Sequence, residues 1–289
     1  MKYFTKIIIF ISITCLVVWF FADQHRIQNV INSNTILLCI WVGFIYILSH
    51  IIRILRLGFL VVDQKKYIPE LTKAHIYTAF PSLLMPFKLG EVLRFIYIVG
   101  VFQDRQKGIC VWLVERLCDL VTLTGVFLIL SILKVELPET ILFYLKVFAF
   151  IGLAFIFSIF AFSQAINYLS HFIILNSSSE RGLRILKVNS LFTQFEAQIL
   201  ELIRGRVLGL VFLTMIIWFL EISAIFLVFK DIDIEKINAI KIFSESLLDR
   251  NLSFNDGVDN QYFGTYKAIS LAIFVAMVLV IIGIKKVKK

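Results

Sequence analysis

Charged residues are scarce in this 289-residue chain, at 17% of positions, where a soluble domain has about 25%. Cysteine is also rare, and the four cysteines lie inside apolar runs without a CxxC pair, which argues against a disulfide framework and a zinc site. The four histidines are dispersed, and the P-loop, GxSxG and HExxH motifs are absent. From these absences we expect no metal and no cofactor.

Apolar residues are abundant instead, at 60% against roughly 45 to 50% in soluble domains, and they are gathered into runs. Most of these runs approach the roughly 20 residues that a helix needs to cross a bilayer. The runs lie near residues 7–21, 35–49, 109–133, 140–162, 207–229 and 266–284. The sequence therefore predicts an all-α integral membrane protein, a polytopic bundle of about six transmembrane helices.

The distribution of charge predicts the orientation of these helices. If the amino terminus is cytoplasmic, most basic residues fall on the cytoplasmic side, including those from Arg53 to Lys107 and the KKVKK tail. The opposite side then holds the loop 230–265, which carries seven acidic residues. The positive-inside rule thus predicts a protein of the bacterial cytoplasmic membrane with both termini in the cytoplasm and an exoplasmic loop 230–265. We attribute the net charge of +9 to lysines and arginines that meet anionic lipid, and we expect no nucleic-acid partner.

A further hydrophobic stretch, residues 74–101, is interrupted by helix-breaking and charged residues. These are Pro81, Pro86, Lys88, Gly90, Glu91 and Arg94. Irregular backbone at membrane depth is tolerated only where protein buries it or it lines a polar cavity, so we expect a broken element that could be re-entrant. Segment 187–204 has the periodicity of an amphipathic helix, lying on the membrane or under the bundle. The chain has no internal repeat and no long linker, so we treat residues 1–289 as one transmembrane domain.

The apolar run 109–133 contains three charged residues, Glu115, Arg116 and Asp119. Each charge in the middle of a span costs about 2.5 to 3.5 kcal/mol on the insertion scale. At about 100° per residue the three lie within one arc of the helix, which cannot face lipid. One interpretation is an internal ion-pair network, with Arg116 bound to Asp119 at i+3. The other is a binding site for a lipid headgroup.

The broken element carries matching charges, because Lys88, Glu91 and Arg94 recur every three residues on a short helix that Pro86 and Gly90 would open. Arginine offers a bidentate fork to phosphate oxygens, and a helix amino terminus adds its positive end. Lys88 and Arg94 could therefore hold a phosphate. Alternatively, Lys88 extends to the membrane surface without a binding role.

Glu221 lies near the middle of the run 207–229 and has no basic residue within a helical turn. We expect it either to be protonated or to pair with a basic residue on another helix, and Arg116 and Arg94 are the obvious candidates.

The runs PFKLGEVLRFIYI and VERLCDLVTLTG follow each other at a short interval, and together they resemble the flippase-like family named after the transmembrane region of lysylphosphatidylglycerol synthase. The residues that match the family pattern are Pro86, Gly90, Glu91, Arg94, Glu115, Arg116 and Asp119, with Trp218 and Glu221 as later matches. Phe87 and Lys88 replace a more usual glycine and arginine. The resemblance implies a polytopic domain that moves or presents a lipid or a lipid-linked sugar.

These observations together predict a protein that binds an anionic phospholipid or a polyprenyl-phosphate-linked lipid and assists its movement across the membrane during envelope or glycan assembly. The expected headgroup-binding residues are Lys88, Glu91, Arg94, Glu115, Arg116, Asp119 and Glu221, and the expected structural residues are Pro86, Gly90 and Trp218. Transport or lipid binding is favoured over catalysis, because the soluble aminoacyl-transferase domain of the synthase is not present in these residues.

Two alternatives of other classes stay open. The first is a membrane-embedded transferase acting on lipid-linked sugars, with Glu115, Asp119 or Glu91 as general base. The second is a non-transporting scaffold that partners envelope or glycan biosynthesis proteins, in which the charged residues are purely structural.

Overall fold

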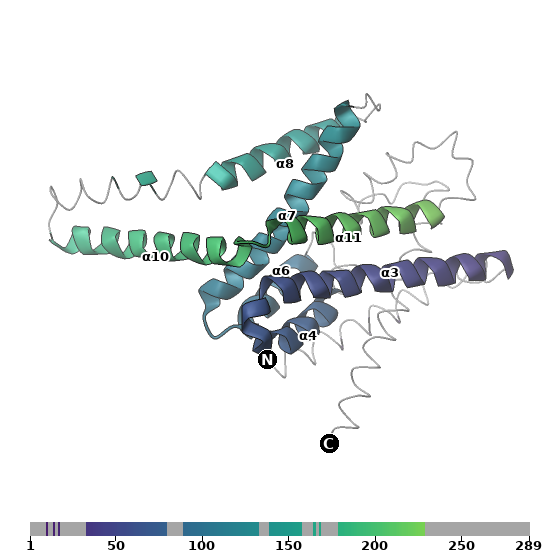
Figure 1. The fold of residues 1–289 in the computed structure, drawn as a ribbon, viewed down its shortest axis with the longest axis horizontal. Helices are drawn as coiled ribbons and strands as arrows, with labels where there is room; N and C mark the ends of the chain where they lie inside the picture. Colours follow the sequence, from purple (N-terminus) through teal and green to yellow (C-terminus); the bar gives the residue numbers. More distant parts are fainter. Residues whose placement is uncertain are drawn as a thin grey trace, which may run out of the picture.

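The computed structural model describes residues 33–79, 89–132, 139–157 and 179–228, with a few isolated positions within 10–17 and 164–168. The described chain is helical and contains no strand, as the sequence predicts. Its elements, shown in Figure 1, are α3 (Ser33–Leu60), η1 (Val62–Tyr67), α4 (Ile68–Ala79), α6 (Leu89–Val101), α7 (Arg105–Ile132), α8 (Glu139–Phe157), α10 (Ser179–Ile203) and α11 (Val207–Val228).

Two segments within the described helices are long and apolar enough to cross a membrane, Ile40–Leu60 of α3 and Val207–Ala224 of α11. The predicted runs 109–133 and 140–162 coincide with α7 and, in large part, with α8. The remaining two predicted spans, 7–21 and 266–284, and the loop 230–265 lie outside the described residues, so the total number of spans stays a prediction.

Helix α3 is longer at its carboxyl end than the predicted span 35–49, since it continues to Leu60. Arg53 and Arg56 therefore lie inside α3 and not in a loop. Their predicted place on the cytoplasmic side stays a prediction. The run HIIRILRLGFL contains no proline to stop the helix, and its basic residues share one face at i and i+3.

Helices α3 and α11 lie side by side over much of their length (Figure 1). A Cβ atom placed on Gly209 would lie 2.7 Å from Cε1 of Phe59, so glycine at this position permits the close approach of the two helices. Gly205, four residues before Gly209, has a φ angle of 70° in the turn between α10 and α11, a conformation that favours glycine.

The broken element predicted for 74–101 contains α4 and α6, and residues 80–88 between them lie outside the described part. A three-residue connection leads from α6 to α7, and these two helices run antiparallel. The pairing shows this, because Val99 approaches Gly108 while Phe95, one turn earlier, stacks on Trp112 at 5.0 Å between ring centroids. The same register brings the charged residues of α6 against those of α7.

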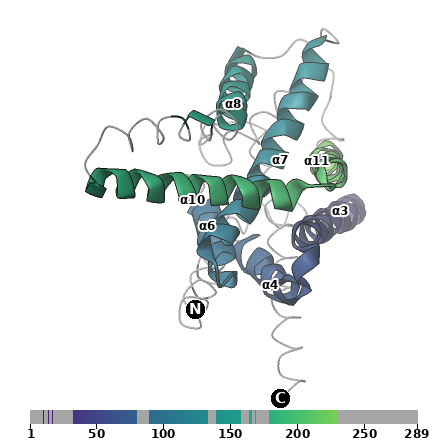
Figure 2. The ribbon, with the colours of Figure 1, turned by 60° about the vertical axis from the view of Figure 1, so that its left-hand side comes forward.

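The helix predicted over 187–204 is α10, and its carboxyl-terminal part packs against the start of α7. Ile199 and Leu202 are buried in an apolar core with Cys110, Val111 and Val114. In Figure 2, α10 runs across the view while α3 and α11 are seen nearly end-on, so α10 lies crosswise to both. This apolar core lies next to the charged residues described below, since its member Val114 precedes Glu115 on α7.

Candidate functional site

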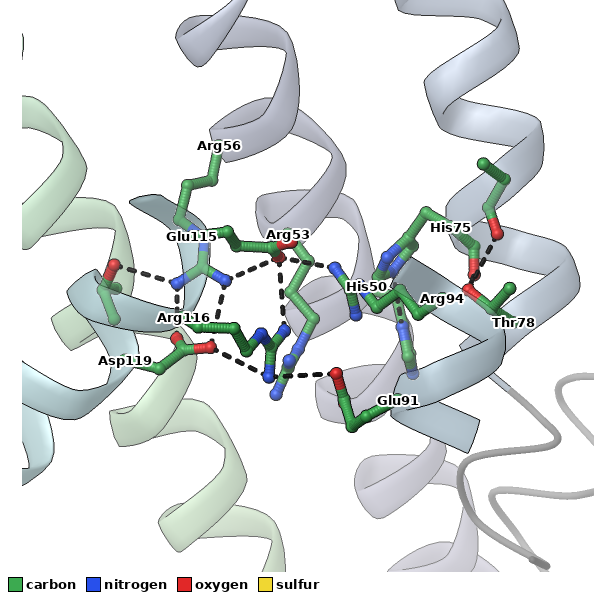
Figure 3. Close-up of polar contacts among 12 residues, drawn as sticks. His50, Arg53, Arg56, His75, Thr78, Glu91, Arg94, Glu115, Arg116 and Asp119 are labelled. Atoms are coloured by element: carbon green, nitrogen blue, oxygen red, sulfur yellow. Dashed lines mark hydrogen bonds and ion pairs between the residues drawn. The ribbon is translucent and has the colours of Figure 1, made fainter. Parts of the chain in front are cut away.

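The side chain of Arg56 is completely buried and connects three helices (Figure 3). Its Nη2 donates to Oε1 of Glu115 at 2.8 Å, and its Nη1 donates to Oδ1 of Asp119 at 2.5 Å and to Oγ1 of Thr214 at 3.0 Å. Glu115 and Asp119 are four residues apart on one face of α7, so a single planar guanidinium reaches both carboxylates. Arg56 thus joins α3 to α7 and α11.

A second arginine binds the same carboxylate from α6. Arg94 is buried, and its Nη2 donates to Oε1 of Glu115 at 2.5 Å. This contact follows from the antiparallel packing of α6 and α7. Glu115, itself fully buried, therefore accepts hydrogen bonds from two guanidinium groups that lie 59 and 21 residues away in the sequence.

The contacts of Arg116 are longer and more accessible than those of Arg56 and Arg94. Its Nη1 lies 3.4 Å from both Oε2 of Glu91 and Oδ2 of Asp119, and its Nη2 lies 3.6 Å from Oε1 of Glu115. The predicted i+3 pair with Asp119 is thus confirmed. The side chains of Arg116 and Glu91 are 28% and 31% exposed, so these two residues form the accessible edge of the network.

Glu221 has a partner on another helix, as one of the two expectations required, but the partner is Arg53. The candidates named from the sequence, Arg116 and Arg94, were wrong. The physical reason is the length of α3, which carries Arg53 along α11 to the level of Glu221. Both side chains are largely buried, with 14% and 12% of their surfaces exposed.

Six of the charged residues, on α3, α6 and α7, are connected by ion pairs, and Arg53–Glu221 is a separate ion pair between α3 and α11. We refer to these eight charged residues together as the network. Four of them are arginines and four are carboxylates, so the charges balance within the described residues. The members are Arg53, Arg56, Glu91, Arg94, Glu115, Arg116, Asp119 and Glu221. Removing a fully buried member, such as Arg56, leaves uncompensated buried charge, which costs about 3 to 5 kcal/mol.

The family described as lysylphosphatidylglycerol synthase TM region matches residues 6–244, which is more than half of the chain and includes every member of the network. The chain belongs to this family. No curated protein and no solved structure matched it. Family membership and the two apolar helices together place the protein in a membrane.

In this member of the family, the structure places most of the predicted site residues together. Glu91, Arg94, Glu115, Arg116, Asp119 and Glu221 are all members of the network. Gly90 is buried at the start of α6, and Trp218 lies half-buried one turn before Glu221 on α11. Lys88 and Pro86 lie outside the described residues.

Sequence reasoning missed four polar residues of this family member. Arg53 and Arg56 were counted as loop residues, and His50 and His75 were set aside as dispersed. In the structure, His50 Nδ1 and His75 Nε2 are 3.1 Å apart, beside Arg94 (Figure 3). Three of these residues could have been found from the sequence. His50, Arg53 and Arg56 are spaced three residues apart, which places them on one face of a helix.

Proposed function

We propose that this protein binds an anionic lipid or a lipid-linked glycan intermediate and assists its movement across the cytoplasmic membrane during envelope or glycan assembly. The observation that carries the proposal is the accessible edge of the network. Arg116 is held there only by long contacts, while the arginines deeper in the network are held by short ones. Intramembrane charges of this kind are by default candidates for a substrate path.

Arg116 has the chemistry to hold a phosphate. Its Nε and Nη2 atoms are buried and have no hydrogen-bond partner in the described part of the chain, so the guanidinium keeps two donors that a ligand could reach once the contacts of Arg116 are displaced. Phosphate oxygens accept bidentate hydrogen bonds from such a fork. A phosphate that enters beside Arg116 would replace the 3.4 Å contacts with Glu91 and Asp119 and would leave both carboxylates to other partners.

The buried arginines would act differently from Arg116. Arg56 already donates to Glu115, Asp119 and Thr214, and it has no exposed surface. It would hold the carboxylates in place while a headgroup passes. Arg94 is bound to Glu115, so it would position that carboxylate instead of contacting the phosphate first.

The contacts support binding over catalysis. A general base must take up a proton during the reaction, whereas pairing with arginine stabilises a carboxylate in its charged form. Glu115 and Asp119 each accept from arginine, and Glu91 lies against Arg116. A scaffold function is the second candidate, and the balanced charges of the network favour it, because a network that satisfies itself can be purely structural.

Lipid analysis separates the two candidates. The protein is purified in mild detergent, and co-purifying lipids are identified by mass spectrometry for wild type, Arg116→Ala and Arg184→Ala. Arg184 is an exposed arginine of α10, so its replacement removes the same charge away from the network. We expect one phosphate-bearing lipid to be enriched with wild type and Arg184→Ala and to be lost from Arg116→Ala. Identical bulk lipids in all three folded proteins would favour the scaffold.

A further inference from the structure

The histidine pair next to the network is a feature that the proposed function does not use. His50 on α3 and His75 on α4 meet through His50 Nδ1 and His75 Nε2, and His75 is buried. A hydrogen bond between two imidazoles requires one ring to donate and the other to accept, so a single proton lies between them. The second nitrogen of His75, Nδ1, is buried without a hydrogen-bond partner in the described residues. In the tautomer in which His75 Nε2 donates to His50 Nδ1, this nitrogen has the lone pair that a further proton would bind.

The charges around the pair are those of the network. Arg94 on α6 and Arg53 and Arg56 on α3 are the cations that act on His75. Their charges are balanced by Glu115 on α7, Asp119 on α7 and Glu221 on α11, as the ion pairs show.

The other charged residues that the structure describes on η1 and α4 lie at the surface or pair elsewhere, and Lys65 and Lys66 on η1 are exposed. On η1, Asp63 is bound to Arg206, and on α4 itself Glu70 is bound to Lys73. The ring of Tyr46 packs on His50, with 4.4 Å between ring centroids.

Charge counting connects the pair to the headgroup site. With four arginines and four carboxylates, the network is neutral before a lipid arrives. A phosphate beside Arg116 adds negative charge, and a buried site of low dielectric favours compensation by a cation. Glu115 and Asp119 stay bound to buried arginines when a phosphate displaces Arg116. Glu91 would lose its contact with Arg116, but glutamate is ordinarily a weaker base than histidine.

Burial and the charges of Arg94, Arg53 and Arg56 oppose a further proton on the pair while the site holds no anion. A phosphate would offset these charges, and histidine is the side chain that can then take up a proton near neutral pH.

We propose that the His50–His75 pair binds a proton together with the anionic headgroup, so that lipid binding and proton uptake are coupled. This inference rests on the proposed function, because it needs a headgroup at Arg116. Linkage makes the coupling reciprocal: headgroup binding promotes protonation, and a fall in pH tightens headgroup binding. Where one proton is taken up per lipid, the affinity changes by up to about tenfold per pH unit.

The test measures binding of dioctanoyl phosphatidylglycerol to the purified full-length protein between about pH 5 and 8, the range in which histidine titrates. This probe is a phosphodiester that keeps a single negative charge throughout that range, so a pH dependence reports on the protein. We expect binding to tighten as the pH falls in wild type and in Lys73→Gln, an exposed change on α4. In His75→Gln and His50→Gln we expect the slope to flatten.

A second measurement does not depend on the folding of any variant. Saturating lipid is added to wild type in weakly buffered solution with a pH indicator, and the proton uptake is measured. We expect uptake approaching one proton per protein.

The outcomes separate the two proposals. If binding depends on Arg116 but no protons are taken up, or if both histidine variants keep the full pH slope, the coupling is wrong and the headgroup site stands. If the lipid shows no Arg116-dependent binding at any pH, the proposed function is wrong and the coupling with it.

Discussion

Arg53 on α3 and Glu221 on α11 form an ion pair between helices whose paired residues are 168 positions apart in the sequence. The pair lies one helical turn from Arg56, which binds α7, so consecutive turns of α3 hold two different helices. Arg53 and Arg56 lie on one face of α3, so α3 fixes the position of α11 relative to α7.

Replacing one member of the Arg53–Glu221 pair should destabilise the protein more than replacing both. Arg53→Met or Glu221→Met alone leaves an unpaired charge in a largely buried site, which costs about 3 kcal/mol, the lower end of the range for buried pairs. The double variant Arg53→Met/Glu221→Met leaves no unpaired charge and should recover most of the loss. The measurement is the thermal unfolding midpoint of the purified protein in detergent.

Glu70→Gln provides the control for this series, because Glu70 pairs with Lys73 on the exposed surface of α4. Exposed ion pairs contribute only about 0 to 1 kcal/mol, so its unfolding midpoint should stay close to that of wild type. Additive losses in the double variant would show that Arg53 and Glu221 do not interact.

Arg56 and Arg116 should respond oppositely to substitution. Arg56→Ala removes four hydrogen bonds from a site without exposed surface and leaves the carboxylates of α7 short of a partner, so we expect little folded protein in the membrane. Arg116→Ala removes only long contacts at the accessible edge and should accumulate normally. The check is the amount of monodisperse protein after detergent extraction.

Arg56→Lys sharpens this comparison, since lysine keeps the charge but lacks the fork that reaches two carboxylates. It should accumulate better than Arg56→Ala and worse than wild type. Equal accumulation of Arg56→Ala and Arg116→Ala would contradict the division between a buried anchor and an accessible edge.

The charged residues of α7 were predictable from the sequence because their signal is local. Glu115, Arg116 and Asp119 interrupt an apolar run, and the high free energy of burying a charge in such a run predicts that they face other helices. Arg94 was found in the same way. The family pattern then joined the two segments, and the antiparallel packing of α6 and α7 confirms that their charges meet.

The contribution of α3 was not predictable in the same way. Arg53 and Arg56 follow directly after an apolar run, where the positive-inside rule also accounts for basic residues, so the sequence does not separate a helix that ends at residue 49 from one that continues to Leu60. The meeting of His50 with His75 depends on the turn between α3 and α4. Contacts that depend on the path of the chain between helices leave no periodic signal.

Gly209→Ala should destabilise the contact between α11 and α3. The added methyl group would lie 2.7 Å from Cε1 of Phe59, and such overpacking costs about 1 to 3 kcal/mol. Gly125→Ala on α7 is the matched control, because a Cβ atom there meets no atom within 4 Å, and alanine should be neutral or stabilising by about 0.5 to 1 kcal/mol. Adding Phe59→Leu to Gly209→Ala should restore the unfolding midpoint in detergent, because the smaller side chain makes room for the methyl group. If Gly209→Ala were as stable as Gly125→Ala, close packing at Gly209 would not hold the two helices together.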